Sequence, residues 1–314
     1  MIITITLNPS VDRTVEIDTL TRGAVMRANS VRVDPGGKGI NVARALARNL
    51  HKTRAVVPKG GSEGDHLISL LAAEGIDTVE VPIGAAIRSN ITVVEPDGTT
   101  TKFNEPGAPF TAAELSRLVD AFLSAAAGAE WAVVSGSVPP GTPEHFYADL
   151  LGMLAGIGTP TALDSSGPAL ASAVVACPVL IKPNREELSE LSGRRVSTVG
   201  DALDAAESLL HNGVRTVLVS LGSDGALLVT SGGAWHAEAP VDLPRSSVGA
   251  GDALLAGFLA AGADGPTALM EAVAWGAAAV SLPGSRMPGP DDINRDAARL
   301  HPSVDRGRAL TDCR

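Results

Sequence analysis

The sequence has 314 residues, of which 45% are hydrophobic and 19% charged, and its formal net charge is −10 at pH 7. This composition is that of a folded globular protein, and the acidic balance disfavours a nucleic-acid or anionic-membrane surface, because both require a cationic footprint. A local basic pocket for a small anionic substrate remains compatible with it. Two cysteines, Cys177 and Cys313, offer no disulfide framework and no metal-ligand set, which favours a reducing, cytoplasmic compartment.

The predicted elements alternate between strands and helices along the chain. The N-terminal apolar run at 2–7 has no basic region before it, which predicts a first strand rather than a signal peptide. Further apolar runs predict strands at 54–57, 131–135, 160–164, 179–182 and 216–220. Helical patterns lie at 41–49, 65–74, 112–126, 144–154, 186–191 and 199–212. This alternation predicts an α/β fold, a doubly wound and mostly parallel sheet with helices on both faces.

Two segments interrupt the alternation. Residues 11–34 alternate apolar and polar side chains, and residues 87–104 hold two β-prone runs around the turn Pro96-Asp97-Gly98. We interpret both as a small antiparallel β lid, although an ordinary edge hairpin fits the pattern equally well. The main domain, which would bind nucleotide and substrate, then comprises residues 1–10, 35–86 and 105–314.

The last third of the chain has a different character. Residues 250–262 and 266–282 predict long helices that are dense in Ala and Gly. The tail after Leu300 is polar, so we expect it to be frayed.

The sharpest local signal is the segment Ser247-Val248-Gly249-Ala250-Gly251-Asp252, which leads into a strongly apolar helix. Backbone N–H groups at a helix start are unpaired and bind anions, and the glycines carry no side chain to obstruct a phosphate. Asp252 would repel that anion unless it acts on the other reactant, where a carboxylate can take the proton of an attacking sugar hydroxyl. The alternative, an N-cap Asp beside loop glycines, is the commoner explanation of such a segment taken alone.

Other motifs for phosphate and metal chemistry do not fit. The third glycine of a dinucleotide fingerprint would fall at Leu254. Residues 35–39 are not a Walker loop, because Arg32 stands at the first glycine and Gly39 at the Ser/Thr. The six histidines, at 51, 66, 145, 211, 236 and 301, lack the spacing of a metal hydrolase.

Six motifs follow one another over nearly the whole chain. They are Thr6-Leu7-Asn8-Pro9 with Asp12, Gly36-Gly37-Lys38-Gly39-Ile40-Asn41, Arg88-Ser89-Asn90, Ser135-Gly136-Ser137-Val138-Pro139-Pro140-Gly141, Lys182-Pro183-Asn184-Arg185-Glu186-Glu187-Leu188 and Gly249-Ala250-Gly251-Asp252. In this order they resemble the PfkB family of ribokinase-like sugar kinases, in the branch of the 1-phosphofructokinases, tagatose-6-phosphate kinases and minor 6-phosphofructokinases. The resemblance implies a ribokinase-like fold and an enzyme that uses ATP and Mg²⁺.

The resemblance implies roles on the nucleotide side. Asp252 is the catalytic base, and the backbone amides of Gly249, Ala250 and Gly251 form the anion hole for the transferring phosphoryl group. Asn184 and Glu187 match an N-x-x-E motif that helps to hold Mg²⁺, largely through water, although a surface Glu beside an N-cap Asn gives the same pattern. The further nucleotide residues are Lys182, Ser220, Gly222, Gly225 and Ser247. Adenine is expected near residues 276–284.

The resemblance also implies a set of substrate-binding residues. Asp12 would bind sugar hydroxyls, with Gly37 and Asn41 completing that wall. Lys38 and Arg88 are the cations expected at the substrate phosphate. Asn90, Ser137 and Asp252 would line the same site. Taken alone, Asp12 would be a turn residue and Lys182 a solvated lysine at a strand end.

The function expected from the resemblance is transfer of phosphate from ATP to a ketohexose phosphate, first fructose 1-phosphate at C6. Tagatose 6-phosphate or fructose 6-phosphate, phosphorylated at C1, comes second. A dinucleotide-dependent oxidoreductase and a non-catalytic sugar or nucleotide sensor are the alternatives of another class. We also expect a homodimer through the β lids, because exposed sheet edges are commonly protected by pairing.

Overall fold

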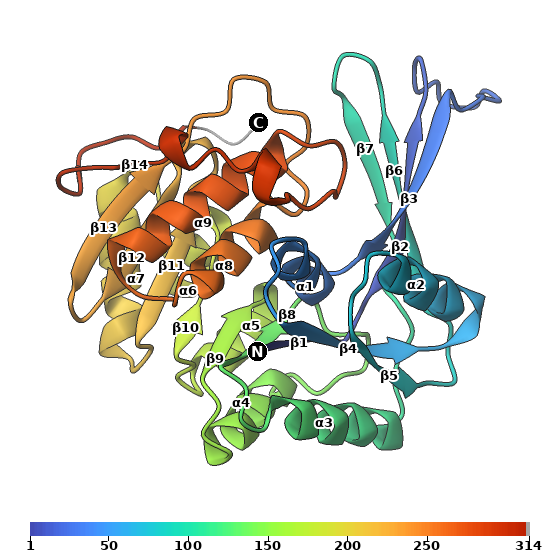
Figure 1. Cartoon of the computed structure of the whole chain (residues 1–314), viewed down its shortest axis with the longest axis horizontal. Coiled ribbons are helices and arrows are strands. Elements are labelled where there is room, and N and C mark those ends of the chain that lie inside the picture. Colours follow the sequence, from blue (N-terminus) through green and yellow to red (C-terminus); the bar gives the residue numbers. More distant parts are fainter. Residues whose placement is uncertain (312–314) are drawn as a thin grey trace.

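The computed structural model describes residues 1–311, which form two sheets (Figure 1). The larger sheet has ten strands, in the order β14 (Arg299–Leu300), β13 (Gly233–Glu238), β12 (Ala226–Thr230), β11 (Thr216–Ser220), β10 (Leu180–Ile181), β9 (Thr161–Asp164), β8 (Trp131–Ser135), β1 (Ile2–Thr6), β4 (Thr53–Lys59) and β5 (Thr78–Pro82). Strands β11 to β5 in this order pair in parallel, whereas β12, β13 and β14 pair antiparallel.

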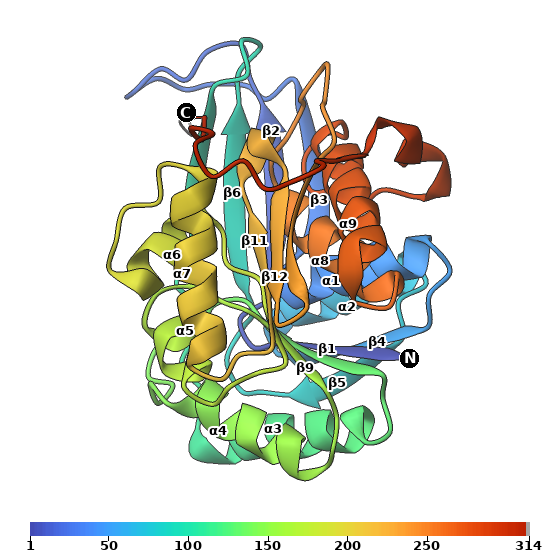
Figure 2. The same cartoon turned by 90° about the vertical axis from the view of Figure 1, so that its left-hand side faces the viewer.

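Helices cover both faces of the larger sheet, as Figures 1 and 2 show. One face carries α3 (Ala112–Ala126), α4 (Phe146–Gly156), α5 (Gly167–Val174), α6 (Arg185–Ser192) and α7 (Val199–His211). The other carries α1 (Lys38–Arg48), α8 (Ala250–Ala260) and α9 (Gly265–Val280), while α2 (Gly61–Ala73) packs between β4 and the smaller sheet. The predicted doubly wound, mostly parallel fold is confirmed.

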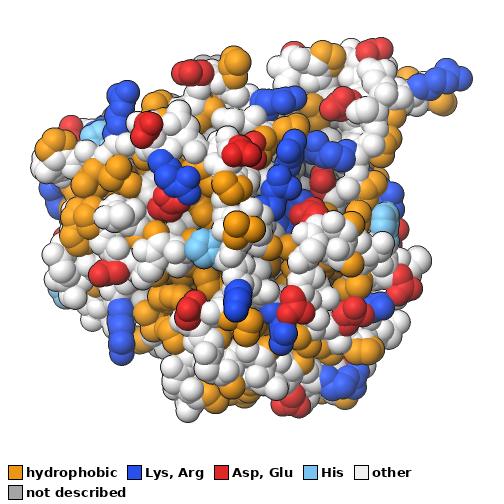
Figure 3. Space-filling model, viewed as in Figure 1, with side chains coloured by type: hydrophobic (Ala, Val, Ile, Leu, Met, Phe, Trp, Pro, Cys, Tyr) orange, Lys and Arg blue, Asp and Glu red, His pale blue; other side chains and the backbone are white. Residues whose placement is uncertain are grey.

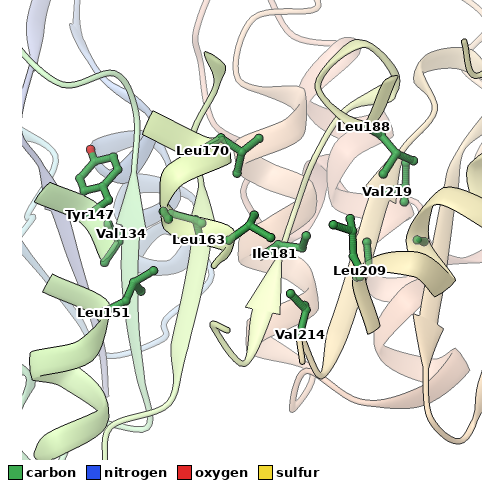
Figure 4. Close-up of a cluster of buried hydrophobic side chains, with 14 of the residues drawn as sticks. Val134, Tyr147, Leu151, Leu163, Leu170, Ile181, Leu188, Leu209, Val214 and Val219 are labelled. Carbon is green, nitrogen blue, oxygen red and sulfur yellow. The ribbon is translucent and has the colours of Figure 1, made fainter. Parts of the chain in front are cut away.

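The core on the α3–α7 face is built from aliphatic side chains of successive strands. Figure 4 shows Val134, Leu163, Ile181 and Val219 in a row across β8 to β11, facing the side chains of the covering helices. All four are fully buried. Burial of one such side chain stabilises the fold by about 1.5–3 kcal/mol, so this row fixes the strand ends that carry the site.

The smaller sheet has the strand order β3 (Ser30–Gly36), β2 (Ser10–Glu16), β6 (Arg88–Val94) and β7 (Thr100–Asn104). It rises beside the main body and consists of two antiparallel hairpins that join through parallel pairing of β2 with β6 (Figure 1). The predicted hairpin at 87–104 is confirmed, and Gly98 at its turn has a φ of 88°, which favours glycine.

Helix α1 begins at Lys38, three residues before the predicted start at 41. Gly37 has a φ of 126° and caps the helix, so glycine suits the point where the chain turns into it. A Cβ on Gly39 would lie 2.7 Å from the carbonyl oxygen of Ile5. The glycines therefore press the start of α1 onto β1, which places the Lys38 side chain over the sheet edge.

The expectation of a frayed tail after Leu300 is wrong for the residues that the structure describes. Leu310 is buried in the core, and its backbone N–H donates to the carbonyl of Ser197 over 2.9 Å. Several elements were also not predicted, namely α5, β5, β12, β13, β14 and the short 3-10 helices η1 (Gly222–Asp224), η2 (Pro290–Asp292) and η3 (Arg295–Ala297). Within residues 1–311, no helix combines the length and apolar character that a bilayer crossing requires.

Candidate active site

The candidate site lies at the carboxyl edge of the larger sheet. Asp164 ends β9, Lys182 directly follows β10, and Ser220 ends β11. The carboxyl ends of parallel strands meet at one edge, where open α/β sheets bind their ligands. On the face shown in Figure 3, Lys and Arg side chains gather between the main body and the smaller sheet, a local cationic region in an acidic protein.

Asp252 occupies the first turn of α8, which Gly249 caps with a φ of 78°. Its side chain is buried, and Oδ2 accepts a hydrogen bond of 2.8 Å from Asn41 Nδ2. Burial, reinforced by the negative charge of Asp164, raises the pKa of Asp252 to about 6. A carboxyl group with that pKa is mostly ionised at neutral pH, yet it is a stronger base than an exposed aspartate.

Arg44, on α1, fixes the orientation of the Asn41 amide. Its Nη1 donates to Asn41 Oδ1 over 3.3 Å and to the carbonyl of Ser285 over 3.0 Å. Because arginine only donates, the amide oxygen must face Arg44 and the amide nitrogen must face Asp252. The guanidinium is itself held by Glu74, so the chain Glu74, Arg44, Asn41, Asp252 is continuous. Neither Glu74 nor Arg44 was predicted from the sequence.

Two lysines converge on Asp164, a fully buried residue that the sequence analysis missed. Lys38 Nζ lies 2.8 Å from Asp164 Oδ1, and Lys182 Nζ lies 3.1 Å from Oδ2. Burial disfavours the ionised form of Asp164, but the charges of Lys182 and Lys38 outweigh it and hold its pKa below the ordinary value. The sequence held one signal for Asp164. The predicted apolar strand at 160–164 ends in this carboxylate, at the same sheet edge as Lys182.

Lys38 also faces Glu187, whose Oε1 lies 3.5 Å from Nζ. Burial alone would lower the pKa of Lys38, but Asp164 and Glu187 outweigh it and raise that pKa, so the ammonium group stays charged. The ammonium group expected at a substrate phosphate thus lies between two carboxylates in this structure.

Asn184 and Glu187 form a capping box at the start of α6. Asn184 Oδ1 accepts from the Glu187 N–H over 2.8 Å, and Glu187 Oε2 accepts from the Asn184 N–H over 2.8 Å. Glu187 Oε1 is left facing Lys38. Among residues 1–311, no three His, Cys, Asp or Glu side chains are gathered closely enough to ligate a metal ion directly. The amide and carboxylate oxygens that are present suit Mg²⁺, which retains several waters.

A cavity of about 430 Å³ opens beside the start of α8. The predicted nucleotide residues Asn184, Ser220, Gly222, Gly225, Ser247, Ala250 and Gly251 line it. Gly249 and Lys182 are not in its lining, but a Cβ on Gly251 would lie 3.3 Å from Lys182 Nζ. The ammonium group of Lys182 is therefore close to the helix start.

The far end of this cavity is apolar. Val241 and Pro244 contribute from the segment after β13, and Val273, Ala277 and Val280 contribute from α9, around Gly276. The sequence analysis expected adenine near 276–284 and named no residues. The structure therefore supplies residues for that region. Val241 and Pro244 could not be named from the sequence, because β13 and the loop after it were not predicted.

The predicted sugar residues gather where the smaller sheet meets the main body. Asp12 Oδ1 accepts from Asn90 Nδ2 over 2.9 Å and from Ser10 Oγ over 2.6 Å. A Cβ on Gly36 would lie 2.3 Å from Asp12 Oδ2, so a side chain at Gly36 would displace that carboxylate. By strand register, Asp12 and Asn90 share one face of the sheet.

Arg88 and Ser137 meet at the loop after β1. Arg88 Nε and Nη2 donate to the carbonyl of Asn8 over 3.2 Å and 3.0 Å, and Nη1 donates to the carbonyl of Glu105 over 2.8 Å. Ser137 Oγ accepts from Asn8 Nδ2 over 3.3 Å. Asp12, Asn90, Arg88 and Ser137 therefore form one hydrogen-bonded group through Glu105 and Asn8. The predicted sugar residue Lys38 lies instead in the lysine–carboxylate cluster, and Asn41 lies beside Asp252.

Comparison with solved structures defines the class of protein. The structure matches that of phosphofructokinase-2 from Escherichia coli in complex with substrates and products, with a TM-score of 0.88 at 35% identity over 93% of this chain and 96% of that chain. The ribokinase-like fold of sugar kinases is thereby confirmed.

The family follows from sequence comparison. A model of the pfkB family carbohydrate kinases matches residues 5–292, and the chain belongs to this family. It is 38% identical over 272 residues to the 1-phosphofructokinase of Xanthomonas campestris pv. campestris, which covers 85% of this chain and 86% of that protein. It is 35% identical over 305 residues to the ATP-dependent 6-phosphofructokinase isozyme 2 of Escherichia coli, which covers 95% and 98%. The chain is a sugar-phosphate kinase, as its motifs predicted.

Proposed function

We propose that the chain transfers the γ-phosphoryl group of ATP to the C6 hydroxyl of fructose 1-phosphate. The observation that carries this proposal is Asp252, a buried carboxylate with a pKa of about 6 that Asn41 holds at a glycine-flanked helix start. One side of that helix start opens into the apolar cavity, and the other faces the lysine–carboxylate cluster. A base placed there can serve an acceptor hydroxyl while the donor lies in the cavity.

The chemical step needs one base and one anion hole. Asp252 takes the proton of the C6 hydroxyl as that oxygen forms a bond to the γ-phosphorus, and the bond from the γ-phosphorus to the bridging oxygen of ADP breaks. The backbone amides of Gly249, Ala250 and Gly251 stabilise the charge on the transferring group, because helix-start N–H groups are unpaired and fixed in place. Lys182, beside Gly251, adds a positive charge to the same place.

ATP would occupy the cavity. Its phosphates face Lys182, Ser247 and the helix start, the backbone of Ser220, Gly222 and Gly225 follows the nucleotide, and adenine packs on the apolar end. Asn184 and Glu187 are the residues that would hold Mg²⁺, largely through water. When bound, Mg²⁺ neutralises charge on the β- and γ-phosphates.

The sugar phosphate would lie over Asp12, Asn90 and Ser137, with the backbone of Gly37 close to it and Asn41 beside the base. Arg88 and Lys38 would bind its phosphate group. Asp164 and Glu187 already neutralise the charge of Lys38, so the substrate phosphate must compete with these two carboxylates for its ammonium group.

The second candidate is phosphorylation at C1 of fructose 6-phosphate or tagatose 6-phosphate. Identity to relatives named 6-phosphofructokinase is as high as to several named 1-phosphofructokinase, which keeps this candidate open. An ADP-release assay across fructose 1-phosphate, fructose 6-phosphate, tagatose 6-phosphate and unphosphorylated sugars decides between them. The proposal predicts the highest kcat/KM for fructose 1-phosphate. Activity on unphosphorylated sugars alone would contradict any phosphate-binding role of Lys38 and Arg88.

We further propose that residues 11–34 and 87–104 act as a lid and that two copies pair through their lids. Val31, Ile91 and Phe103 are 59%, 41% and 56% exposed, and strand register puts them on the face opposite Asp12. Phe103→Asp should convert a homodimer into a monomer in sedimentation velocity. A wild-type chain that is monomeric at working concentration would rule the pairing out.

We place the enzyme in the cytoplasm, where ATP and sugar phosphates are held and the exposed Cys177 thiol stays reduced.

A further inference from the structure

The segment 306–311 returns across the main body to the nucleotide cavity. The Val199 N–H donates to the carbonyl of Arg308 over 3.0 Å, and the Leu310 N–H donates to the carbonyl of Ser197 over 2.9 Å. Leu310 is buried in the core under α7. The segment is thus anchored along its length, although its composition is polar.

This segment contacts the loop 220–225 through one buried carboxylate. Asp224 ends η1, and only 5% of the residue is exposed. Its Oδ2 accepts from the Thr311 N–H over 2.7 Å, and its Oδ1 accepts from Arg308 Nη2 and from Thr311 Oγ1, both over 3.3 Å. Ser223 and Gly225 line the cavity, whereas Asp224 is not in that lining. The carboxylate therefore holds the loop from behind.

Thr311 also reaches the opposite wall of the cavity. Arg185, which follows Asn184 and lines the cavity, donates from Nη1 to the Thr311 carbonyl over 2.9 Å. A single residue of the C-terminal segment therefore connects the start of α6 to η1.

Strand β13 supports the same loop from a third direction. His236 Nε2 donates to the carbonyl of Asp224 over 2.7 Å, since a carbonyl only accepts. Arg308 Nη2 also donates to Glu238 over 2.9 Å, which ties the C-terminal segment to β13 as well. A Cβ on Gly225 would lie 2.1 Å from the carbonyl oxygen of Ala237, so the loop is pressed onto this strand.

We propose that residues 308–311 form a strap that positions the nucleotide-binding loop, with Asp224 as the positioning residue on which the strap acts. The loop needs such support because Gly222 and Gly225 have φ values of 64° and 84°, in the region that glycine samples freely. The strap orders the loop before the nucleotide arrives, so nucleotide binding does not carry the conformational entropy cost of ordering it. This inference rests on the proposed function, in which the cavity holds ATP.

Asp224→Ala tests the strap, because it removes the carboxylate from behind the loop without touching the cavity lining. The loss of hydrogen bonds to a charged group should raise the KM for MgATP about tenfold, with the sugar-phosphate KM within about twofold of wild type. Asp224→Asn keeps the size and one acceptor oxygen, so its effect should be intermediate. Arg306→Ala is the matched control, since it removes an exposed ion pair with Asp204 from the same segment and should leave both KM values unchanged.

Calorimetric titration with MgATP and a thermal melt complete the test. A wild-type chain that binds no MgATP would contradict the proposed function itself. Wild-type binding that Asp224→Ala leaves unchanged would overturn the strap alone, even if the melting temperature falls, because a merely structural role lowers stability without weakening nucleotide binding. A weaker affinity for MgATP in Asp224→Ala, with wild-type affinity in Arg306→Ala, is the expected result.

Discussion

The nucleotide cavity and the sugar-facing group are built on different principles. The cavity is lined mainly by small and aliphatic residues, together with polar residues such as Asn184, Ser220 and Ser247, and it is already open in this structure. The sugar-facing group consists of polar side chains that bind one another, such as Asp12 with Asn90 and Arg88 with the backbone of Asn8. In the proposed function a nucleotide would enter the open cavity, whereas a sugar phosphate would exchange partners with the polar group.

The proposed base, Asp252, is buried beside Asn41 and close to the charged groups of Asp164, Lys38 and Lys182. Changes in the cavity should act through shape and on ATP alone. Changes in the polar group should act through charge and mainly on the sugar phosphate.

The largest effect is expected from the residue that both regions share. Asp252→Asn removes the base while keeping the size of the side chain, and kcat should fall about 10³-fold with both KM values within a fewfold of wild type. Steady-state ADP release measures this fall in kcat and both KM values. Asp149→Asn, in the first turn of α4, is the control and should be fully active. Wild-type turnover in Asp252→Asn would remove the base from the mechanism.

The proposed binding of the sugar phosphate is tested by Lys38→Ala, in the lysine–carboxylate cluster. The sugar-phosphate KM should rise about 30-fold, because a charge-assisted contact to the phosphate is lost, while the KM for ATP should change little. Lys59→Ala removes an exposed lysine and serves as the control. A rise in the KM for ATP alone would instead assign Lys38 to the nucleotide side, together with Asp164 and Glu187.

The cavity is tested by Ala277→Leu. The larger side chain narrows the apolar end, and overpacking of this kind should raise the KM for ATP about tenfold without affecting the sugar phosphate. Ala155→Leu, on the exposed face of α4, is the matched control. If ATP binds Ala277→Leu as well as it binds the wild type, adenine does not lie against α9.

The last expected effect is on stability rather than on catalysis. The folded-state pKa of Asp252, about 6, lies above the ordinary value of 3.8, so the ionised carboxylate destabilises the fold above pH 6. This destabilisation fades as the pH falls through 6 towards 4. Asp252→Asn should therefore be more stable than wild type by about 2 kcal/mol at pH 8, with a smaller difference at pH 5, in urea unfolding. A less stable variant at pH 8 would contradict the raised pKa.

The site residues that the sequence could propose are those whose expected chemistry depends on local backbone. Gly249 to Asp252 form a helix start that can be recognised without knowing what packs around it. Asp164 and Arg44 differ, because their importance comes from partners far along the chain, Lys38 and Lys182 for the first and Ser285 for the second. Sequence spacing carries no trace of such contacts.

The missed elements have a related cause. Strands β12 and β13 form an antiparallel edge to a parallel sheet, so the alternation of strands and helices did not predict them. Helix α5 is short and starts with Gly167 and Pro168, which resemble a turn. The tail was expected to fray because it is polar, yet its backbone pairs with residues near Thr198. In the strands and in the tail, tertiary pairing overrode local composition.

The pH dependence of kcat/KM for fructose 1-phosphate is the most direct test of Asp252 as the base, because this parameter reports the pKa values of the enzyme before the sugar phosphate binds. The wild type should lose activity with a slope of one as the pH falls through about 6, because protonation of the carboxyl group removes the base. The residual activity of Asp252→Asn should lack that decline, whereas titration of the substrate phosphate would remain in both proteins. The same acid decline in wild type and variant would show that another group receives the proton.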